Sequence, residues 1–166
     1  MTARLAPIRG AALVVGMAVT GCGPSEPNRL AELPKVRMTI GGRPFELWVA
    51  DRWDTQSKGL MFVTAAEMAP LPDGTERGMI FIFDRSVRDS FWMKNTVIPL
   101  DIAYIDSKGK IVTTYTMAPL DSRSGHYRPD APYRFAIEIN ANRLTELGIG
   151  KGAVLEIPPS VLKRTR

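Results

Sequence analysis

The chain is divided into many short apolar runs, and this division limits most strongly the fold that it can adopt. These runs are rich in β-branched and aromatic residues and too short for typical helices, so they favour strands. Turn-forming residues separate them, as at Gly41-Gly42 and in Asp106–Gly109. The runs are Val36–Ile40, Pro44–Val49, Gly78–Phe83, Val87–Met93, Ile102–Ile105, Lys110–Thr116, Phe135–Ile139 and Gly152–Ile157.

Two short helices are also predicted. Asp54 is suited to cap a helix over Thr55–Leu60, and Asn140 is suited to cap one over Ala141–Leu147 that ends at Gly148. The chain has no internal repeat and no strand–helix–strand alternation. The sequence therefore predicts a mostly β fold with a minor α part, a compact antiparallel β-barrel-like domain with two short helices.

Residues 1–21 predict a lipoprotein signal peptide. Arg4 and Arg9 precede Gly10–Val19, an uncharged and mostly apolar segment that is too short to span a bilayer comfortably. The next residues, Val19–Cys22 (VTGC), resemble a bacterial lipobox, in which cleavage before the cysteine leaves a lipidated Cys22. An ordinary secretory signal followed by a chance cysteine is the alternative.

A lipidated Cys22 predicts a cell-envelope protein, anchored to a membrane and facing the periplasm. Gly23, and not an acidic residue, follows the cysteine, which by resemblance to Gram-negative lipoprotein sorting favours the outer membrane over the inner one. Cys22 is the chain's one cysteine, so we expect no disulfide. We divide the rest into a Pro-rich tether (22–34), a single β-rich domain (35–158) and a basic tail (159–166) that frays.

The charge of the chain does not indicate a nucleic-acid partner. The formal net charge is +5, and two of the basic residues, Arg4 and Arg9, lie in the predicted signal peptide. The mature chain then carries 20 basic against 17 acidic side chains, a net charge of +3 that is spread along the sequence. A nucleic-acid-binding protein more often shows a basic cluster or a known motif, so we expect no nucleic acid.

Candidate binding residues gather in Ser90–Asp106. Trp92, Lys94 and Asn95 combine a flat apolar ring, a cation and an amide, a set that suits a small anionic or sugar-like ligand. Asp101 belongs to the same stretch. A long loop that contains His126 is a further candidate, because such loops are often functional.

A structural role is the alternative for the same residues. Asn95 and Asp101 would then cap the irregular turn before Pro99, and Lys94 would be an ordinary exposed base. Catalysis is a further alternative, since Lys94 with Asp101 or Glu138 can perform acid/base chemistry where the lysine is buried.

A metal site has weaker support in the sequence. Met61, Met79 and Met93 offer soft thioether groups of the kind that select Cu(I). All three lie in apolar runs, however, where methionine usually fills the core. We expect no metal and no cofactor.

Several segments resemble, in the same order, the domain-of-unknown-function family 192. The resemblance extends from Val36 to Ile157 and implies a compact β-barrel-like fold, but it brings no established reaction, substrate or cofactor. The segments that carry it are Gly59–Phe62, Gly78–Phe83, Phe91–Thr96, Ile98–Asp101, Glu138–Asn140 and Gly152.

The sequence thus predicts an envelope lipoprotein that binds a small polar ligand or a protein partner at the rim of a β-barrel. Two other functions stay open. One is a small hydrolase or transferase that uses Lys94 with a carboxylate. The other is a scaffold module without a small-molecule site. The residues favour a binding protein over an enzyme.

Overall fold

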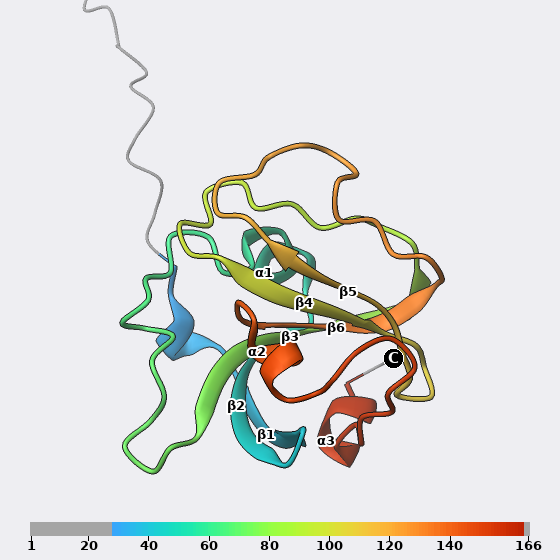
Figure 1. The fold of residues 1–166 in the computed structure, drawn as a ribbon, viewed down its shortest axis with the longest axis horizontal. Coiled ribbons are helices and arrows are strands. Elements are labelled where there is room, and N and C mark those ends of the chain that lie inside the picture. Colours follow the sequence, from blue (N-terminus) through green and yellow to red (C-terminus); the bar gives the residue numbers. More distant parts are fainter. Residues whose placement is uncertain (1–27, 165–166) are drawn as a thin grey trace, which may run out of the picture.

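Six strands form one sheet in the order β1-β2-β3-β6-β4-β5 (Figure 1). The computed structural model describes residues 28–164. The predicted mostly β fold is confirmed. The strands span Lys35–Ile40 (β1), Arg43–Ala50 (β2), Glu76–Val87 (β3), Leu100–Ile105 (β4), Ile111–Met117 (β5) and Tyr133–Asn140 (β6).

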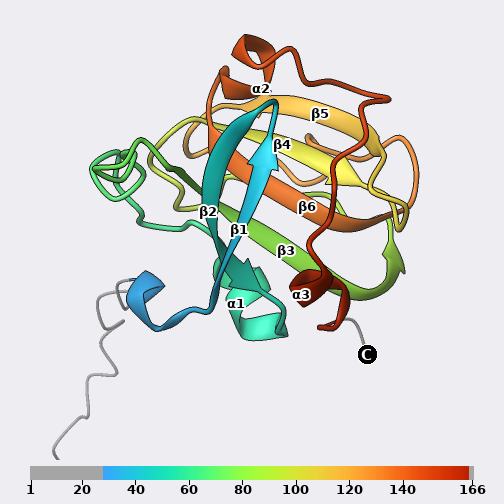
Figure 2. The same cartoon turned by 90° about the horizontal axis from the view of Figure 1, so that it is seen from below.

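The sheet is mixed and open, so the expected antiparallel barrel-like arrangement is wrong. β2 and β3 pair in parallel, whereas the other neighbours pair antiparallel. The chain leaves β2 through a helix and a long segment before β3 begins, and this crossover lets β3 run in the same direction as β2. The outermost strands, β1 and β5, do not pair with each other within the described residues, and β1 and β2 cross the direction of β4 and β5 steeply (Figure 2).

Each face of the sheet carries an apolar cluster. On β6, Phe135, Ile137 and Ile139 belong to one cluster, while Ala136 belongs to the other. Alternation along the strand places Glu138 on the face of Ala136. A carboxyl group therefore lies on the face of a central strand that also contributes Ala136 to an apolar cluster.

In the part of the chain that the structure describes, three α-helices and one 3-10 helix flank the sheet. They span Leu30–Glu32 (η1), Trp53–Lys58 (α1), Arg143–Glu146 (α2) and Pro159–Leu162 (α3).

Both predicted helices exist, but their caps differ from the prediction. α1 follows Arg52, whose backbone N–H donates to Thr55 Oγ1 at 3.2 Å, and not Asp54, which lies inside the helix. α2 follows Asn142 because Asn140 is still part of β6, where its Nδ2 donates to a backbone oxygen at 3.2 Å.

Two predicted strands are wrong. β3 continues to Val87, and the chain then leaves the sheet, so that the rest of the predicted strand, residues 88–93, contributes only an isolated bridge at Phe91. Gly152–Ile157 likewise contributes one bridge, at Val154. Apolar residues such as the fully buried Met93 can pack against the sheet from an irregular segment as well as from a strand. The local sequence pattern does not distinguish these two structures.

Both ends of the described chain are folded against the domain. Leu30 is buried in an apolar cluster, and Asn28 Nδ2 donates to the backbone oxygens of Gly59 (2.7 Å) and Met61 (3.1 Å). The start of the predicted tail forms α3, so it is not frayed there, and Val161 is fully buried.

The predicted signal peptide and Cys22 lie outside the described residues. Within residues 28–164, no helix is both long enough and apolar enough to cross a membrane.

Candidate functional site

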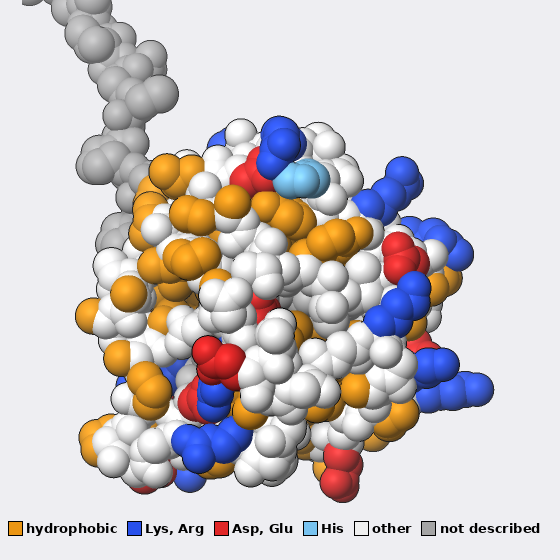
Figure 3. Space-filling view, viewed as in Figure 1, with side chains coloured by type: hydrophobic (Ala, Val, Ile, Leu, Met, Phe, Trp, Pro, Cys, Tyr) orange, Lys and Arg blue, Asp and Glu red, His pale blue; other side chains and the backbone are white. Residues whose placement is uncertain are grey.

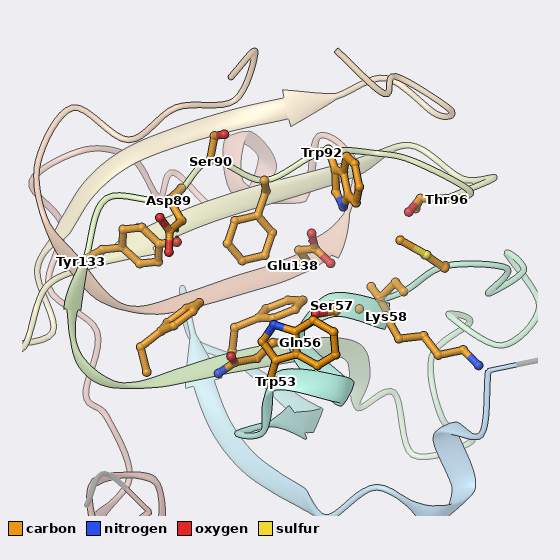
Figure 4. Close-up of a pocket in the computed structure, with 16 residues that line it drawn as sticks. Trp53, Gln56, Ser57, Lys58, Asp89, Ser90, Trp92, Thr96, Tyr133 and Glu138 are labelled. Carbon is orange, nitrogen blue, oxygen red and sulfur yellow. Dashed lines mark hydrogen bonds between the residues drawn. The ribbon is translucent and has the colours of Figure 1, made fainter. Parts of the chain in front are cut away.

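A cleft of about 280 Å³ opens between α1 and the segment that follows β3 (Figure 4). Trp53 on α1 and Trp92 lie on opposite sides of it, with Glu138 between them (Figure 4). Both tryptophans are largely exposed, at 81% and 45%. Its aromatic lining consists of Trp53, Phe81, Phe83, Phe91, Trp92 and Tyr133.

Glu138 is a buried ionisable group of this cleft. Its side chain lies in the middle of the sheet, because its strand neighbours are Met79 on β3 and Ile102 on β4. Only 4% of Glu138 is exposed, and its carboxyl group forms no hydrogen bond or ion pair with another described residue. Burial of this group in apolar surroundings raises its pKa to about 8, because the charged form loses its water.

The fold holds the two walls of the cleft by hydrogen bonds to backbone oxygens. Gln56 Nε2 on α1 donates to Ile82 O at 2.7 Å and thereby docks the helix on the end of β3. Tyr133 Oη donates to Asp89 O at 3.0 Å and holds the opposite wall. These bonds leave the cleft formed without a ligand, as small-molecule sites usually are.

Lys94 lies outside this cleft. Its Nζ is placed over the Trp92 ring, 5.2 Å from the centroid, and its side chain is exposed. Trp92 itself lines the cleft, so the structure separates these two predicted residues: Trp92 lies at the cleft and Lys94 does not. The predicted acid/base pairs with Lys94 would require a buried lysine, and Lys94 is exposed.

Asn95 forms a tight turn beside the cleft. It adopts a left-handed backbone conformation (φ 58°), and Thr96 N donates to Met93 O at 3.1 Å across the turn. Asn95 O accepts a hydrogen bond from Phe62 N at 2.8 Å, which ties this segment to the one after α1. Its side chain makes one weak contact, from Nδ2 to Met61 Sδ at 4.0 Å.

Asp101 has a structural set of partners. It is 1% exposed and accepts hydrogen bonds from Thr116 Oγ1 (2.6 Å) and from the backbone N–H groups of Asn142 (3.0 Å) and Leu144 (2.8 Å). The last two groups belong to the start of α2, where the helix leaves N–H groups unpaired. Asp101 therefore anchors α2 to the sheet and does not reach the cleft.

His126 belongs to a separate exposed cluster. Its Nδ1 lies 2.5 Å from Asp121 Oδ2, and its ring stacks on Tyr127 at 4.5 Å between centroids. Arg123 contributes to the same cluster, and its hydrogen bonds to the Asp121 carboxylate, with those of His126 and Tyr127, hold the pKa of Asp121 well below its usual range. Figure 3 shows the histidine beside acidic and basic side chains at the edge of this face.

The three candidate methionines do not share a common site. Met79 and Met93 are fully buried in the apolar core, and Met61 lines the cleft. Within the described chain no three His, Cys, Asp or Glu side chains are grouped so as to hold a metal ion.

Most of the cleft was not foreseen from the sequence. The sequence named Trp92 and Glu138 but missed Trp53, Gln56 and Phe81, which complete the walls. Trp53 could have been identified from the sequence, because a large aromatic residue at the start of a short polar helix is unusual and indicates a contact surface. Phe81 could not have been identified in this way, because the apolar segment Gly78–Phe83 indicates only a buried strand.

The fold and the cleft define a small mixed-sheet domain with an aromatic cleft, in which the buried carboxyl group of Glu138 has no partner among residues 28–164. The chain belongs to the family DUF192, described as an uncharacterized ACR family, whose model matches residues 36–157. The predicted resemblance is therefore confirmed. No curated protein matches the chain.

Two solved structures share the fold. One is that of a proposed transcription regulator from Sinorhizobium meliloti, with 31% identity and a TM-score of 0.63, covering 75% of this chain and 94% of that one. The other is a protein of unknown function from Novosphingobium aromaticivorans, with 28% identity and a TM-score of 0.65, covering 82% of this chain and 94% of that one.

Proposed function

We propose that this domain is a binding module that holds a small polar ligand in the cleft against Glu138. The observation that supports this proposal is a carboxyl group that is 4% exposed, lacks a partner among the described residues and faces an aromatic cleft. Burying such a group without a hydrogen bond costs free energy, and such groups are rare unless they serve a function. A ligand that bonds to Glu138 removes this cost.

A thermal-shift screen of the full-length protein in detergent tests this proposal. A ligand at 100 times its dissociation constant stabilises a protein by about 2.7 kcal/mol, which raises the melting temperature by several degrees. The library contains sugars, amines, organic acids and nucleotides. The variants are Glu138→Gln, which removes the charge but keeps the shape, and Lys94→Ala, which removes a nearby charge outside the cleft.

We expect a ligand that stabilises the wild type and Lys94→Ala but not Glu138→Gln. A ligand whose effect is lost in Lys94→Ala and kept in Glu138→Gln would move the site away from the cleft and contradict the proposal. The absence of any stabilising compound across all ligand classes would favour the scaffold alternative.

Acid/base catalysis is a second candidate function, which the pKa of Glu138 favours. A carboxyl group with a pKa of about 8 can both donate and accept a proton near neutral pH. This role needs no help from Lys94. Incubating each stabilising ligand with the protein, followed by mass spectrometry, separates the two functions, since a binding module returns the ligand unchanged.

We also propose that the domain acts at the cell envelope, anchored through a lipidated Cys22 and favouring the outer membrane. The support is the sequence VTGC after an apolar segment. Metabolic labelling with a radioactive fatty acid should mark the wild-type protein and leave Cys22→Ser unmarked. Equal labelling of both proteins, or of neither, would contradict the lipid anchor.

The regulator role proposed for the Sinorhizobium meliloti protein is not extended to this chain. Several arginines are engaged by carboxylates, as in the contacts from Arg143 to Glu76 (2.6 Å) and from Arg123 to Asp121 (2.7 Å). Charged side chains of both signs are scattered over the face drawn in Figure 3. A nucleic-acid site would more often gather basic groups along one element.

A further inference from the structure

We propose that the ligand of the cleft is a small organic cation, an ammonium compound whose charge lies against the Glu138 carboxylate and between aromatic rings. This inference rests on the proposed function and names the class of ligand. It stands on the geometry of the cleft, which brings together one acidic group at the base and tryptophan rings at two sides (Figure 4).

Among residues 28–164, no positively charged side chain forms an ion pair with Glu138. Burial is the cause that raises its pKa, and the ion pairs of the described chain do not include this residue. Lys58 lines the cleft from α1, but its Nζ points away from Glu138 (Figure 4). The cation that would keep a buried carboxylate charged therefore has to come from the ligand.

The remaining titratable groups near Glu138 do not compete for this role. Asp89 lines the cleft from the segment after β3, and it adds a second acidic group to the lining. Tyr133 on β6 and Tyr104 on β4 are neutral groups, because burial raises the pKa of each above the ordinary value. The charges that face Glu138 thus favour a positive ligand over a negative one.

The aromatic walls favour an organic cation. A tryptophan ring attracts a cation placed over its face, and such contacts strengthen where water is excluded. The Lys94 ammonium lies over the Trp92 ring, 5.2 Å from its centroid. No cation from the described residues lies over the Trp53 ring, and Trp53 is 81% exposed. A ligand seated between the two tryptophans would cover apolar surface that now faces water.

A metal ion fits the cleft less well. Hard cations need several oxygen ligands, and the structure groups no three acidic, histidine or cysteine side chains within residues 28–164. The volume of about 280 Å³ instead suits a small molecule. A neutral sugar, which can also stack on tryptophan, is the alternative that the experiment has to separate.

Binding of the cation releases a proton. The free site holds Glu138 mainly as the neutral acid below pH 8, and the complex holds it as the carboxylate. The ammonium group keeps its charge, and the proton of the Glu138 carboxyl passes to solvent. No covalent bond of the ligand forms or breaks.

The experiment uses choline, whose charge does not change with pH, and its uncharged isostere, in which a tert-butyl group replaces the trimethylammonium group. Glucose serves as the neutral sugar probe. Dissociation constants of the full-length protein in detergent are measured by tryptophan fluorescence and calorimetry between pH 6 and pH 9. Glu138→Gln is compared with Glu156→Gln, which changes an exposed carboxyl outside the cleft lining.

We expect choline to bind more tightly than its isostere, with an affinity that rises with pH and levels off above pH 8. If only the carboxylate form binds, the increase from pH 6 to pH 9 is about 90-fold, given a pKa of about 8. Glu138→Gln should weaken binding and remove the pH dependence, whereas Glu156→Gln should retain both.

Two results would overturn the inference in distinguishable ways. Equal or tighter binding of the isostere or of glucose, lost in Glu138→Gln, would refute the cationic ligand and keep the binding function of the cleft. No binding of any of the three probes, with unchanged fluorescence of the tryptophans, would count against both the cationic ligand and the proposed function.

Discussion

At the scale of single residues, Glu138 is the position where the local pattern and the environment disagree most. It alternates with Ile137 and Ile139 as an outward polar residue of a half-buried strand would, yet it is 4% exposed. Segments distant in sequence, around Leu60 and Phe91, cover this face of the sheet and turn the polar position into a buried one.

The stability of the domain should fall as the pH rises from 5 to 9, owing to Glu138. Its pKa is about 8 in the folded state and 4.5 ordinarily, so the folded state binds the proton more tightly. The contribution of this group to the free energy of unfolding is complete below pH 4.5 and falls as the pH rises to about 8, above which it is lost. The total loss is on the order of 5 kcal/mol as an upper bound.

Urea unfolding at several pH values checks this prediction. Wild type should lose stability relative to Glu138→Gln as the pH rises from 6 to 9, and Glu156→Gln should follow the wild type. Parallel curves for wild type and Glu138→Gln would show that Glu138 keeps an ordinary pKa.

Asp101, by contrast, should matter for stability and not for binding. Asp101→Ala leaves the N–H groups of Asn142 and Leu144 without their acceptor, and each unpaired buried group costs about 1–3 kcal/mol. We expect a loss of about 3 kcal/mol in urea unfolding, and a smaller loss for Asp101→Asn, which keeps one acceptor oxygen. A change below about 1 kcal/mol in Asp101→Ala would contradict the anchoring role.

At the scale of elements, the close contact between β3 and β6 positions Glu138. Gly78 on β3 lies opposite Ile139, and the two strands approach there with no room for a side chain. A Cβ atom at position 78 would lie 2.8 Å from Ile139 Cγ2 and still closer to the backbone oxygen of Glu138. The glycine in the GMIFIF run therefore has a packing role.

Gly78→Ala should destabilise the domain by about 2 kcal/mol or more, because overpacking at the centre of a sheet forces the backbone to shift. Gly150→Ala is the matched control, since a Cβ atom there meets nothing within 4 Å and should leave stability nearly unchanged. Thermal or urea unfolding measures both. Similar stability of the two variants would mean that β3 and β6 adjust to a larger residue without cost.

At the scale of the whole molecule, the folded domain begins earlier than the sequence indicates. The expected tether extends to residue 34, but η1 packs Leu30 against the core, and Asn28 bonds to the segment after α1. That segment includes Leu60 and Met61, which line the cleft. The N-terminal part of the domain thus supports one wall of the candidate site.

A chain that starts at Pro34 should be less stable than one that starts at Asn28. Loss of a buried leucine contact costs about 2–5 kcal/mol, and Leu30 is 6% exposed. Urea unfolding of both chains, with Leu30→Ala in the longer one, measures this effect. Equal stability of the two chains would show that residues 28–34 do not stabilise the domain and belong to the tether.

Patterns along the chain were enough to predict much of the local structure and the family. Alternation and turn residues predicted the hairpin of β1 and β2, the buried run in β3 and the end of α2 near Gly148, since these depend on neighbours along the chain. The ordered motifs from Gly59 to Gly152 identified the family that the comparison confirmed.

The strand order and the position of the cleft, by contrast, follow from contacts in three dimensions. The parallel pairing of β2 with β3, the open edges of the sheet and the path of residues 88–96 over β6 depend on contacts between distant segments. For the same reason the cleft is lined by Glu138, Trp92 and Trp53. The other predicted residues, Lys94, Asp101 and His126, lie outside it. Burial is a property of the folded whole, and it gives Glu138 its neutral form and its proposed role.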